Sequence, residues 1–289
     1  MIRKRVIAAV IIKNGFVVQS IGFRRWLPVG SVAVTVEALN QWGADEIILL
    51  DIDASREGRT IPLETVRAAA ARSFVPLTVG GGLESVQAMD RILAVGADKV
   101  CVNKAVLRTP NLLTEAASLF GRQCVVASLD ARKSAAGHEV FGDGGRTPAG
   151  VAVAALAQRC EELGAGEILI NSIDRDGAKT GYDLDLIGSV VAAVGVPVVA
   201  LGGAGAPEHF EAALRIPGVS GAAAANMLNF TEHSVSLVKA WLKRAGILVR
   251  IDTAANYADA AFAADGRLAK KADDALAELF WEYHAPEVV

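Results

Sequence analysis

The segment GADEIILLDID (43–53) decides the fold, because a closely similar segment, GAGEILINSID, returns at 164–174. A second pair of segments, VPLTVGGG (75–82) and VPVVALGG (196–203), is separated by the same offset of 121 residues. One offset shared by two separate motifs is typical of an internal duplication. The sequence therefore predicts two similar halves, each with one copy of every site element.

Short apolar runs alternate along the chain with helical patterns, as in the strand–helix units of a parallel sheet. Eight strand-like runs can be recognised, at 5–11, 46–52, 76–80, 98–103, 124–130, 167–172, 197–202 and 221–225. Several are followed by stretches of helical periodicity, such as VAVTVEALNQWG, LETVRAAAARS, ESVQAMDRILAVG and PEHFEAALRI. Eight units predict an α/β fold, a (β/α)8 TIM barrel built from two half-barrels.

Composition excludes several classes of protein. The chain has 289 residues, 52% of them hydrophobic, and a formal net charge of -3, which excludes a disordered or fibrous protein. Without a basic tract or an apolar run of ~18 residues, we expect no nucleic acid partner and no membrane span. With no signal cleavage site either, we expect a cytoplasmic protein. Three scattered cysteines and four histidines show no metal-ligand spacing, so we expect neither a metal nor another cofactor.

The last part of the chain lies outside the repeated pattern. We expect the barrel to occupy residues 1–250 and residues 251–289 to form an acidic, alanine-rich extension. Within it, KKADDALAELFWEY (270–283) has the pattern of an amphipathic helix.

Glycines follow the third and seventh predicted strands, at the end of a barrel where active sites lie. Gly81 and Gly82 in one half correspond to Gly202 and Gly203 in the other. Glycine lets a backbone approach a ligand and exposes N–H groups to a phosphate. These glycines could instead serve only as tight turns, but two matching copies favour two phosphate sites. The pattern predicts a ligand with a phosphate at each end.

Five aspartates lie at or just beyond strand ends and are candidates for acid–base chemistry: Asp51, Asp53, Asp130, Asp174 and Asp176. Helix capping is a competing explanation for Asp53 and Asp174. It fits Asp130 less well, because the segment after Asp130 is long and helix start signals appear only near Thr147.

Four charged residues occupy strand starts, at the opposite end of the barrel: Arg5, Glu46, Lys99 and Glu167. Such charges are usually solvated edges. A closed ring of alternating charge could instead gate a passage through the barrel, and spacing alone does not decide between the two.

These features together resemble the cyclase subunit of imidazole glycerol phosphate synthase, a glutamine amidotransferase of histidine biosynthesis. The resemblance runs from Arg5 to about Arg250. Its most specific motifs are TVGGG (78–82), GADKVCVN (96–103), VVASLDA (125–131), GAGEILINSIDRDGAKTGYD (164–183) and GGAGAPEHF (202–210).

The resemblance implies a substrate with two phosphates and ammonia supplied by a separate glutaminase subunit docked on the barrel floor. It implies that Arg5, Glu46, Lys99 and Glu167 form the ammonia gate and that Asp98 contacts the glutaminase. Asp130 matches one of the two catalytic aspartates of the family, and Asp176 could replace the other. The expected phosphate- and substrate-binding residues are Asp51, Gly81, Gly82, Asn103, Lys104, Asn171, Gly202, Gly203, Ala225 and Asn226.

The sequence departs from the family at the mouth of the barrel. Ile11 stands where the family has its first catalytic aspartate, and loss of a catalytic carboxylate typically costs ~10² to 10⁴ in rate. The lysine of the mobile first loop is replaced by Gln19. Lys104, Asn171 and Leu201 replace small hydroxyl residues of the family.

With the gate retained and the cyclase site altered, the chain resembles paralogues from bacterial surface-polysaccharide pathways. In these, barrel and glutaminase supply ammonia to an ATP-dependent amidotransferase that acts on a nucleotide-linked sugar. We expect such an ammonia-delivering role. The alternatives are an authentic cyclase that makes imidazole glycerol phosphate and, less favoured because Ile11 counts against it, a phosphosugar isomerase on the same half-barrel plan.

Overall fold

The fold is taken from a computed structural model of the chain. It describes residues 3–135, 137–231, 233–251, 257, 260–264 and 266–269.

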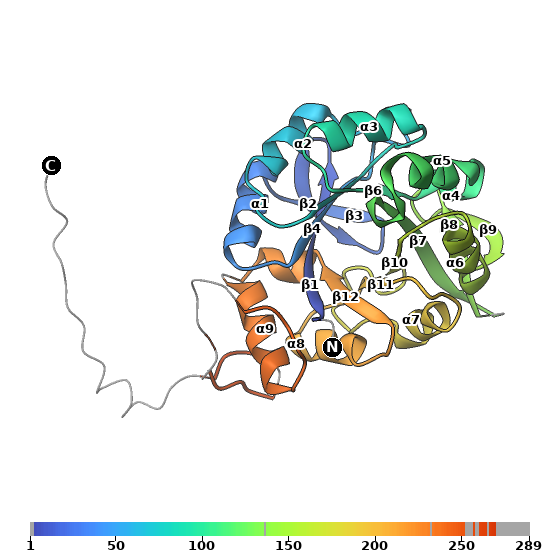
Figure 1. The fold of residues 1–289 in the computed structure, drawn as a ribbon. Coiled ribbons are helices and arrows are strands. Elements are labelled where there is room, and N and C mark those ends of the chain that lie inside the picture. The colour runs from blue at the N-terminus through green and yellow to red at the C-terminus, as the bar shows by residue number, and fades with distance from the viewer. Residues whose placement is uncertain are drawn as a thin grey trace, which may run out of the picture.

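Eight parallel strands form a closed barrel in the described part of the chain (Figure 1). In chain order they are β1 (Arg5–Lys13), β4 (Glu46–Asp51), β5 (Leu77–Gly80), β6 (Lys99–Val102), β7 (Val125–Ser134), β10 (Glu167–Ser172), β11 (Val198–Leu201) and β12 (Val219–Ala224). Strand β1 pairs with both β4 and β12, and β7 pairs with β10, so no edge of the barrel remains open. The predicted TIM barrel and the eight predicted strands are confirmed.

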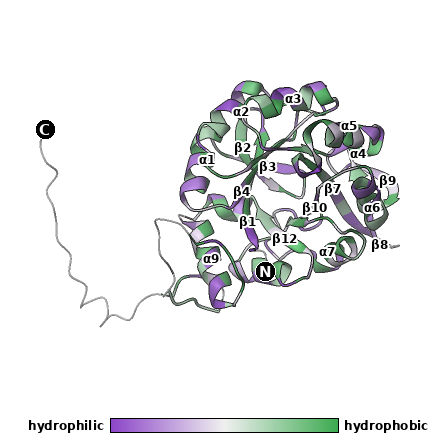
Figure 2. Cartoon of the chain, viewed as in Figure 1, coloured by the Kyte–Doolittle hydropathy of each residue, from purple (hydrophilic) through white to green (hydrophobic). Residues whose placement is uncertain are grey.

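Helices surround the barrel and show alternating hydrophilic and hydrophobic segments in Figure 2. They are α1 (Val32–Gln41), α2 (Leu63–Ala70), α3 (Val86–Ala94), α4 (Lys104–Arg108), α5 (Asn111–Phe120), α6 (Val153–Glu162), α7 (Leu184–Val191), α8 (Pro207–Leu214) and α9 (Ser234–Arg244). Short 3-10 turns, η1 (Arg122–Cys124) and η2 (Asn226–Asn229), complete the set. Side chains of Ser31, Ser85 and Asp183 accept hydrogen bonds from the first turns of α1, α3 and α7, which fixes where these helices begin.

Two antiparallel hairpins are inserted at the mouth. One consists of β2 (Phe16–Ile21) and β3 (Arg25–Gly30), the other of β8 (Gly137–Gly142) and β9 (Thr147–Ala152). The sequence-based expectation of a helix starting near Thr147 was wrong, because Thr147 opens β9 and α6 begins at Val153. The barrel strand β7 itself continues past Asp130 and pairs with β8.

The apolar core has two layers. A large outer cluster lies between the strands and the helices, and a smaller inner cluster lines the lumen. Alternation along β1 explains the division, since Val6, Ala8 and Val10 belong to the outer cluster and Ile7 and Ala9 to the inner one.

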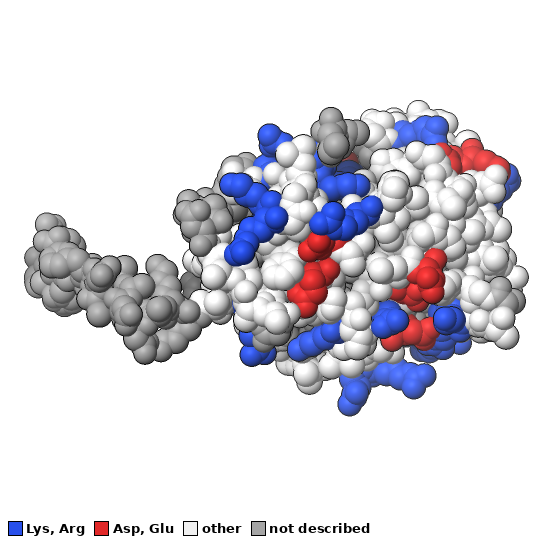
Figure 3. All heavy atoms as spheres, turned by 90° about the horizontal axis from the view of Figure 1, so that it is seen from below, with Lys and Arg blue, Asp and Glu red and all other residues white. Residues whose placement is uncertain are grey.

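Beyond α9, Phe262 packs edge-on against Trp241 at 5.5 Å between ring centroids. The predicted helix at 270–283 lies outside the described residues. In the part of the chain that is described, no helix combines the length and apolarity required to cross a membrane. The face in Figure 3 shows basic and acidic side chains interspersed on a largely uncharged surface.

Candidate functional site

The four charged residues at the strand starts form a closed ring across the floor of the barrel. Arg5 pairs with Glu46 at 2.6 Å and also with Glu167. Lys99 completes the ring, at 3.0 Å from Glu46 and 2.9 Å from Glu167. Thr78 donates a further hydrogen bond of 2.6 Å to Glu46. The ring of alternating charge is therefore present, and the solvated-edge explanation does not apply.

Both glutamates of the ring are buried, with side-chain exposures of 3% for Glu46 and 8% for Glu167. Burial raises the pKa of Glu167, but Arg5 and Lys99 outweigh it, so that this pKa lies below its ordinary value. Burial likewise opposes the charge of Arg5, yet the two glutamates raise its pKa. The ring thus favours the charged forms of both Glu167 and Arg5.

The lumen above the ring is lined by uncharged side chains, among them Ile7, Ile48, Val126 and Leu169. Burial raises the pKa of Cys101, also in this cluster, to about 12, so its thiol stays neutral. A neutral small molecule such as ammonia is favoured over an ammonium ion in these surroundings, because burying an unpaired charge is costly.

Asp130 lies at the mouth end, where β7 leaves the barrel. Asn103 and Asn171 each donate a side-chain hydrogen bond of 3.1 Å to its carboxylate, one to each oxygen. Burial raises the pKa of Asp130 to about 6, against the effect of the two amides and with a contribution from the charge of Asp176. A carboxyl with a pKa near the working pH is suited to general acid–base catalysis.

Ile11 occupies the mouth end of β1 and is 9% exposed. It lies two residues beyond Ala9, so alternation along the strand directs it toward the lumen side. An alkyl side chain at this position can neither give nor take a proton.

Asp176 holds the β2–β3 hairpin over the mouth. Its carboxylate accepts hydrogen bonds from the Ser20 hydroxyl at 2.7 Å and from the Phe23 N–H at 3.1 Å, and its carbonyl accepts from the Gly22 N–H at 3.0 Å. Asn226 also binds this hairpin. Its side-chain oxygen accepts a hydrogen bond from the Ser20 N–H, and its side-chain amide donates a hydrogen bond of 2.6 Å to the Ser20 carbonyl. Burial raises the pKa of Asp176. Both residues thus have anchoring contacts that spacing did not reveal.

The paired glycine turns occupy matching positions in the two halves. A Cβ on Gly82 would overlap the carbonyl of Arg59, and a Cβ on Gly203 would overlap that of Gly181. Their φ angles of 66° and 105° also favour glycine. Close backbone packing and positive φ are thus sufficient to require glycine at both places.

Other predicted site residues lie around the mouth. Asp51 is buried and pairs with Arg59 at 2.6 Å. Lys104 opens α4, and its ammonium group lies 3.2 Å from Glu84 and 3.3 Å from the Ser55 carbonyl. Further members of the predicted set also follow strand ends: Gly81 after β5, Gly202 after β11 and Ala225 after β12.

Asp98 lies at the floor, directly before Lys99, the ring residue of β6. It is exposed, and its carboxylate accepts a hydrogen bond of 2.8 Å from the Leu77 N–H. The structure thus leaves this side chain accessible from outside the barrel.

Asp53 and Asp174 do not cap helices. Asp53 pairs with Lys13 at 2.7 Å, and Asp174 accepts a hydrogen bond from the Lys133 N–H. Asp174 also pairs with Arg132 across a hollow at the mouth. Sequence reasoning missed this arginine-lined hollow, whose only prior signal was the unusual FRRW (23–26) of the first hairpin.

Comparison with known proteins agrees with this geometry. The family described as histidine biosynthesis protein matches residues 5–234. Among curated proteins, the chain is similar to the imidazole glycerol phosphate synthase subunit HisF of Clostridium botulinum strain Langeland, with 43% identity over 253 residues, which are 87% of this chain and all of that protein. The corresponding subunits of strains Okra and Kyoto are 43% and 42% identical over the same shares of each chain. This chain belongs to the histidine biosynthesis protein family and, within that family, to the HisF-like cyclase subunits.

Proposed function

We propose that this chain is a cyclase-type subunit of a glutamine amidotransferase, in which ammonia enters at the charged ring and reacts at the mouth. The observation that carries the proposal is the alignment of three features along one barrel: the closed ring, the neutral lumen and Asp130 with its pKa of about 6. The ring excludes bulk ions, and the lumen favours a neutral nitrogen nucleophile.

The ammonia source is a glutaminase subunit docked at the floor. Asp98 is exposed there and is offered as a contact to that partner. No nucleophile for glutamine hydrolysis is indicated in this chain, because its cysteines do not lie in a glycine-rich turn beside a histidine. Ammonia therefore has to come from outside the barrel.

At the mouth, the acceptor is a phosphorylated small molecule held between the two glycine turns. Asp130 exchanges protons with it, and Asn103 and Asn171 hold the carboxylate in place. Similarity to the cyclase subunits supports imidazole glycerol phosphate formation, together with release of the aminoimidazole fragment, as the reaction. Asp176 supplies the second carboxylate, because position 11, where the family has an aspartate, is an isoleucine.

A second candidate is favoured by Ile11 itself. An ammonia-delivering paralogue needs the ring and the lumen but no acid on β1, and its acceptor would be bound by an ATP-dependent amidotransferase in surface-polysaccharide biosynthesis. The sequence alone favoured this candidate, whereas the similarity to known proteins supports the cyclase.

One assay separates the two. Purified protein is given the phosphoribulosyl-formimino substrate and saturating ammonium, and loss of the substrate is followed for the wild type, Asp130→Asn and Ile11→Asp. Turnover that falls by about 10² or more in Asp130→Asn supports the cyclase. No turnover in wild-type protein that still binds a glutaminase contradicts the cyclase and supports delivery to another protein.

A further inference from the structure

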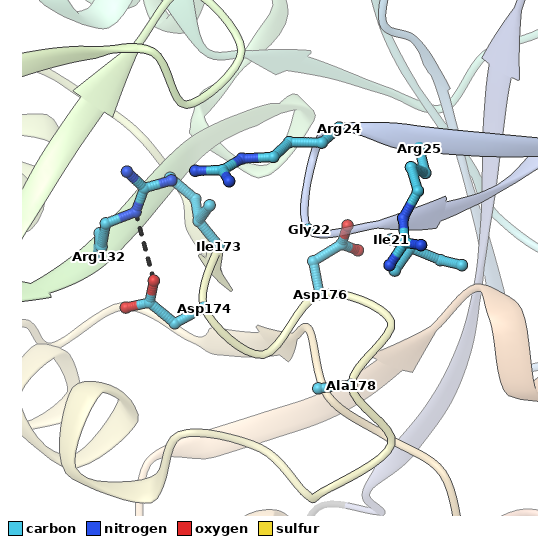
Figure 4. Close-up of a pocket in the computed structure, with 9 residues that line it drawn as sticks. All are labelled: Ile21, Gly22, Arg24, Arg25, Arg132, Ile173, Asp174, Asp176 and Ala178. Atoms are coloured by element: carbon cyan, nitrogen blue, oxygen red, sulfur yellow. Dashed lines mark ion pairs between the residues drawn. The ribbon is translucent and has the colours of Figure 1, made fainter.

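A hollow of about 520 Å³ lies at the mouth beside Asp176 (Figure 4). Three arginines line it, Arg24 and Arg25 from the first hairpin and Arg132 from β7. None of the residues expected to bind phosphate at the glycine turns belongs to its lining. The hollow is therefore distinct from the two glycine turns, although Asp176 of the proposed acid–base site forms part of its wall. Its volume lies in the range of small-molecule sites, roughly 300–1,000 Å³.

Positive charge exceeds negative charge in this hollow. Arg132 lies 3.3 Å from Asp174 and stacks at 4.8 Å on the ring of Phe141. Arg24 and Arg25 form no ion pair with any other residue of the described ranges. Three guanidinium groups thus face only two carboxylates, those of Asp174 and Asp176.

The hairpin turn fixes where the two unpaired arginines lie. The Arg24 N–H donates to the Ile21 carbonyl at 3.2 Å, and the turn is hydrogen-bonded to Asp176 through its neighbours. The second hairpin packs against this turn, because Gly145 lies close to the ring of Phe23 and to the side chain of Ile173. Arg24 precedes β3 and Arg25 opens it, so the two do not follow strand alternation, and both line the hollow. In Figure 4 the Arg24 side chain extends toward Arg132, whereas Arg25 lies on the other side of Gly22, beside Ile21.

We propose that Arg24, Arg25 and Arg132 bind a diphosphate group of a small-molecule ligand at this hollow. Each guanidinium presents a planar fork that pairs with two phosphate oxygens, and three forks match a group with several negative charges. A ligand with a single carboxylate would pair with only one of the three guanidinium groups. This site goes beyond the proposed function, because neither the ammonia route nor the two glycine-turn sites requires it.

Calorimetric titration of the full chain with inorganic pyrophosphate tests the proposal. Arg24→Gln combined with Arg25→Gln, and Arg132→Gln alone, are compared with Arg146→Gln, which removes an exposed arginine of the β8–β9 turn outside the hollow. We expect Kd to rise about tenfold or more for the double variant and for Arg132→Gln. Arg146→Gln should leave it unchanged. Arg24→Lys combined with Arg25→Lys keeps the positive charge but removes the planar guanidinium groups that pair with two oxygens at once, and it should weaken binding as well.

Three results would overturn the proposal: no pyrophosphate binding by the wild type at millimolar concentration, equal binding by wild type and the double glutamine variant, or succinate binding as tight as pyrophosphate binding. The double glutamine variant also separates this site from the proposed function. Failure here leaves ammonium-dependent turnover untouched, since that assay depends on Asp130. Failure of the turnover assay leaves pyrophosphate binding to be measured independently.

Discussion

Asn171 on β10 donates a hydrogen bond of 3.1 Å from its side-chain amide to one carboxylate oxygen of Asp130 on β7. The two residues are register partners on neighbouring barrel strands, so the contact follows directly from closure of the barrel. Asn103 makes the equivalent contact from the other side. Two neutral donors stabilise the charged form of Asp130 and oppose the effect of burial on its pKa.

Removing one donor should raise the pKa of Asp130 further. In Asn171→Leu, the charged carboxylate loses one hydrogen bond while burial continues to disfavour it. We therefore expect the pKa to move above its present value of about 6. Carbon-13 NMR titration of the aspartate carboxyls measures the shift directly. An unchanged or lowered pKa would show that Asn171 does not stabilise the carboxylate.

Asp130 should also reduce stability at neutral pH. Its pKa is raised from 3.8 to about 6, so the folded state binds the proton more tightly than the unfolded state. The stability it confers is complete below pH 3.8 and is lost as the pH rises through about 6. In Asp130→Asn the new side chain has one acceptor oxygen for the two amide donors, a cost that is the same at both pH values. Relative to the wild type, the free energy of unfolding of Asp130→Asn should therefore be about 1–3 kcal/mol higher at pH 7 than at pH 4. Urea unfolding at both pH values checks this, and an equal change at both would contradict it.

The contribution of the charged ring to stability should depend on pH in the opposite sense to that of Asp130. The pKa of Glu167 lies below its ordinary value of 4.5, so its contribution to stability is present above that value and lost as the pH falls through the lower folded pKa. Glu167→Gln should cost about 1–3 kcal/mol at pH 7, because Arg5 and Lys99 each lose a buried partner.

Glu162→Gln is the matched control for the ring. Glu162 forms an exposed pair with Arg159 on α6, and such pairs contribute about 0–1 kcal/mol. Chemical unfolding of both variants at pH 7 and at acid pH gives the comparison. Equal costs for the two variants would show that the ring adds no more than a surface pair.

A comparison of Gly203 with Gly144 distinguishes the cost of steric overlap from the cost of backbone strain. Both have positive φ angles, of 105° and 68°, but a Cβ on Gly203 would overlap the Gly181 carbonyl and one on Gly144 would meet nothing within 4 Å. Gly144→Ala should cost about 1 kcal/mol, and Gly203→Ala should cost at least about 2 kcal/mol more. Thermal unfolding measures both, and similar losses would contradict the overlap.

The barrel could be predicted from sequence because one repeat offset and eight apolar runs specify it. The ring could be located from residues at strand starts, although its closure depends on side-chain geometry that spacing does not contain. The second hairpin was missed, because β8 and β9 carry few β-branched residues and Thr147 lies in a segment with turn-like glycines on both sides.

The anchoring contacts at the mouth were beyond sequence reasoning for a different reason. Asp176 was expected to act as an acid–base residue and Asn226, through the family resemblance, to bind substrate. Their contacts with Ser20 join residues 156 and 206 positions apart. The same holds for the two asparagines at Asp130. The Ser20 contacts depend on how the first hairpin folds back over the barrel, and the Asp130 contacts depend on the register of neighbouring barrel strands. Local sequence patterns encode neither.

The most direct measurement of the ammonia route uses glutamine labelled with nitrogen-15 in its side-chain amide. A docked glutaminase subunit hydrolyses it while unlabelled ammonium is present in bulk, and the nitrogen entering the aminated product is analysed by mass spectrometry. Passage through the ring and lumen predicts a product that carries the label regardless of bulk ammonium. A product labelled only in proportion to the mixed bulk pool would contradict passage through the barrel.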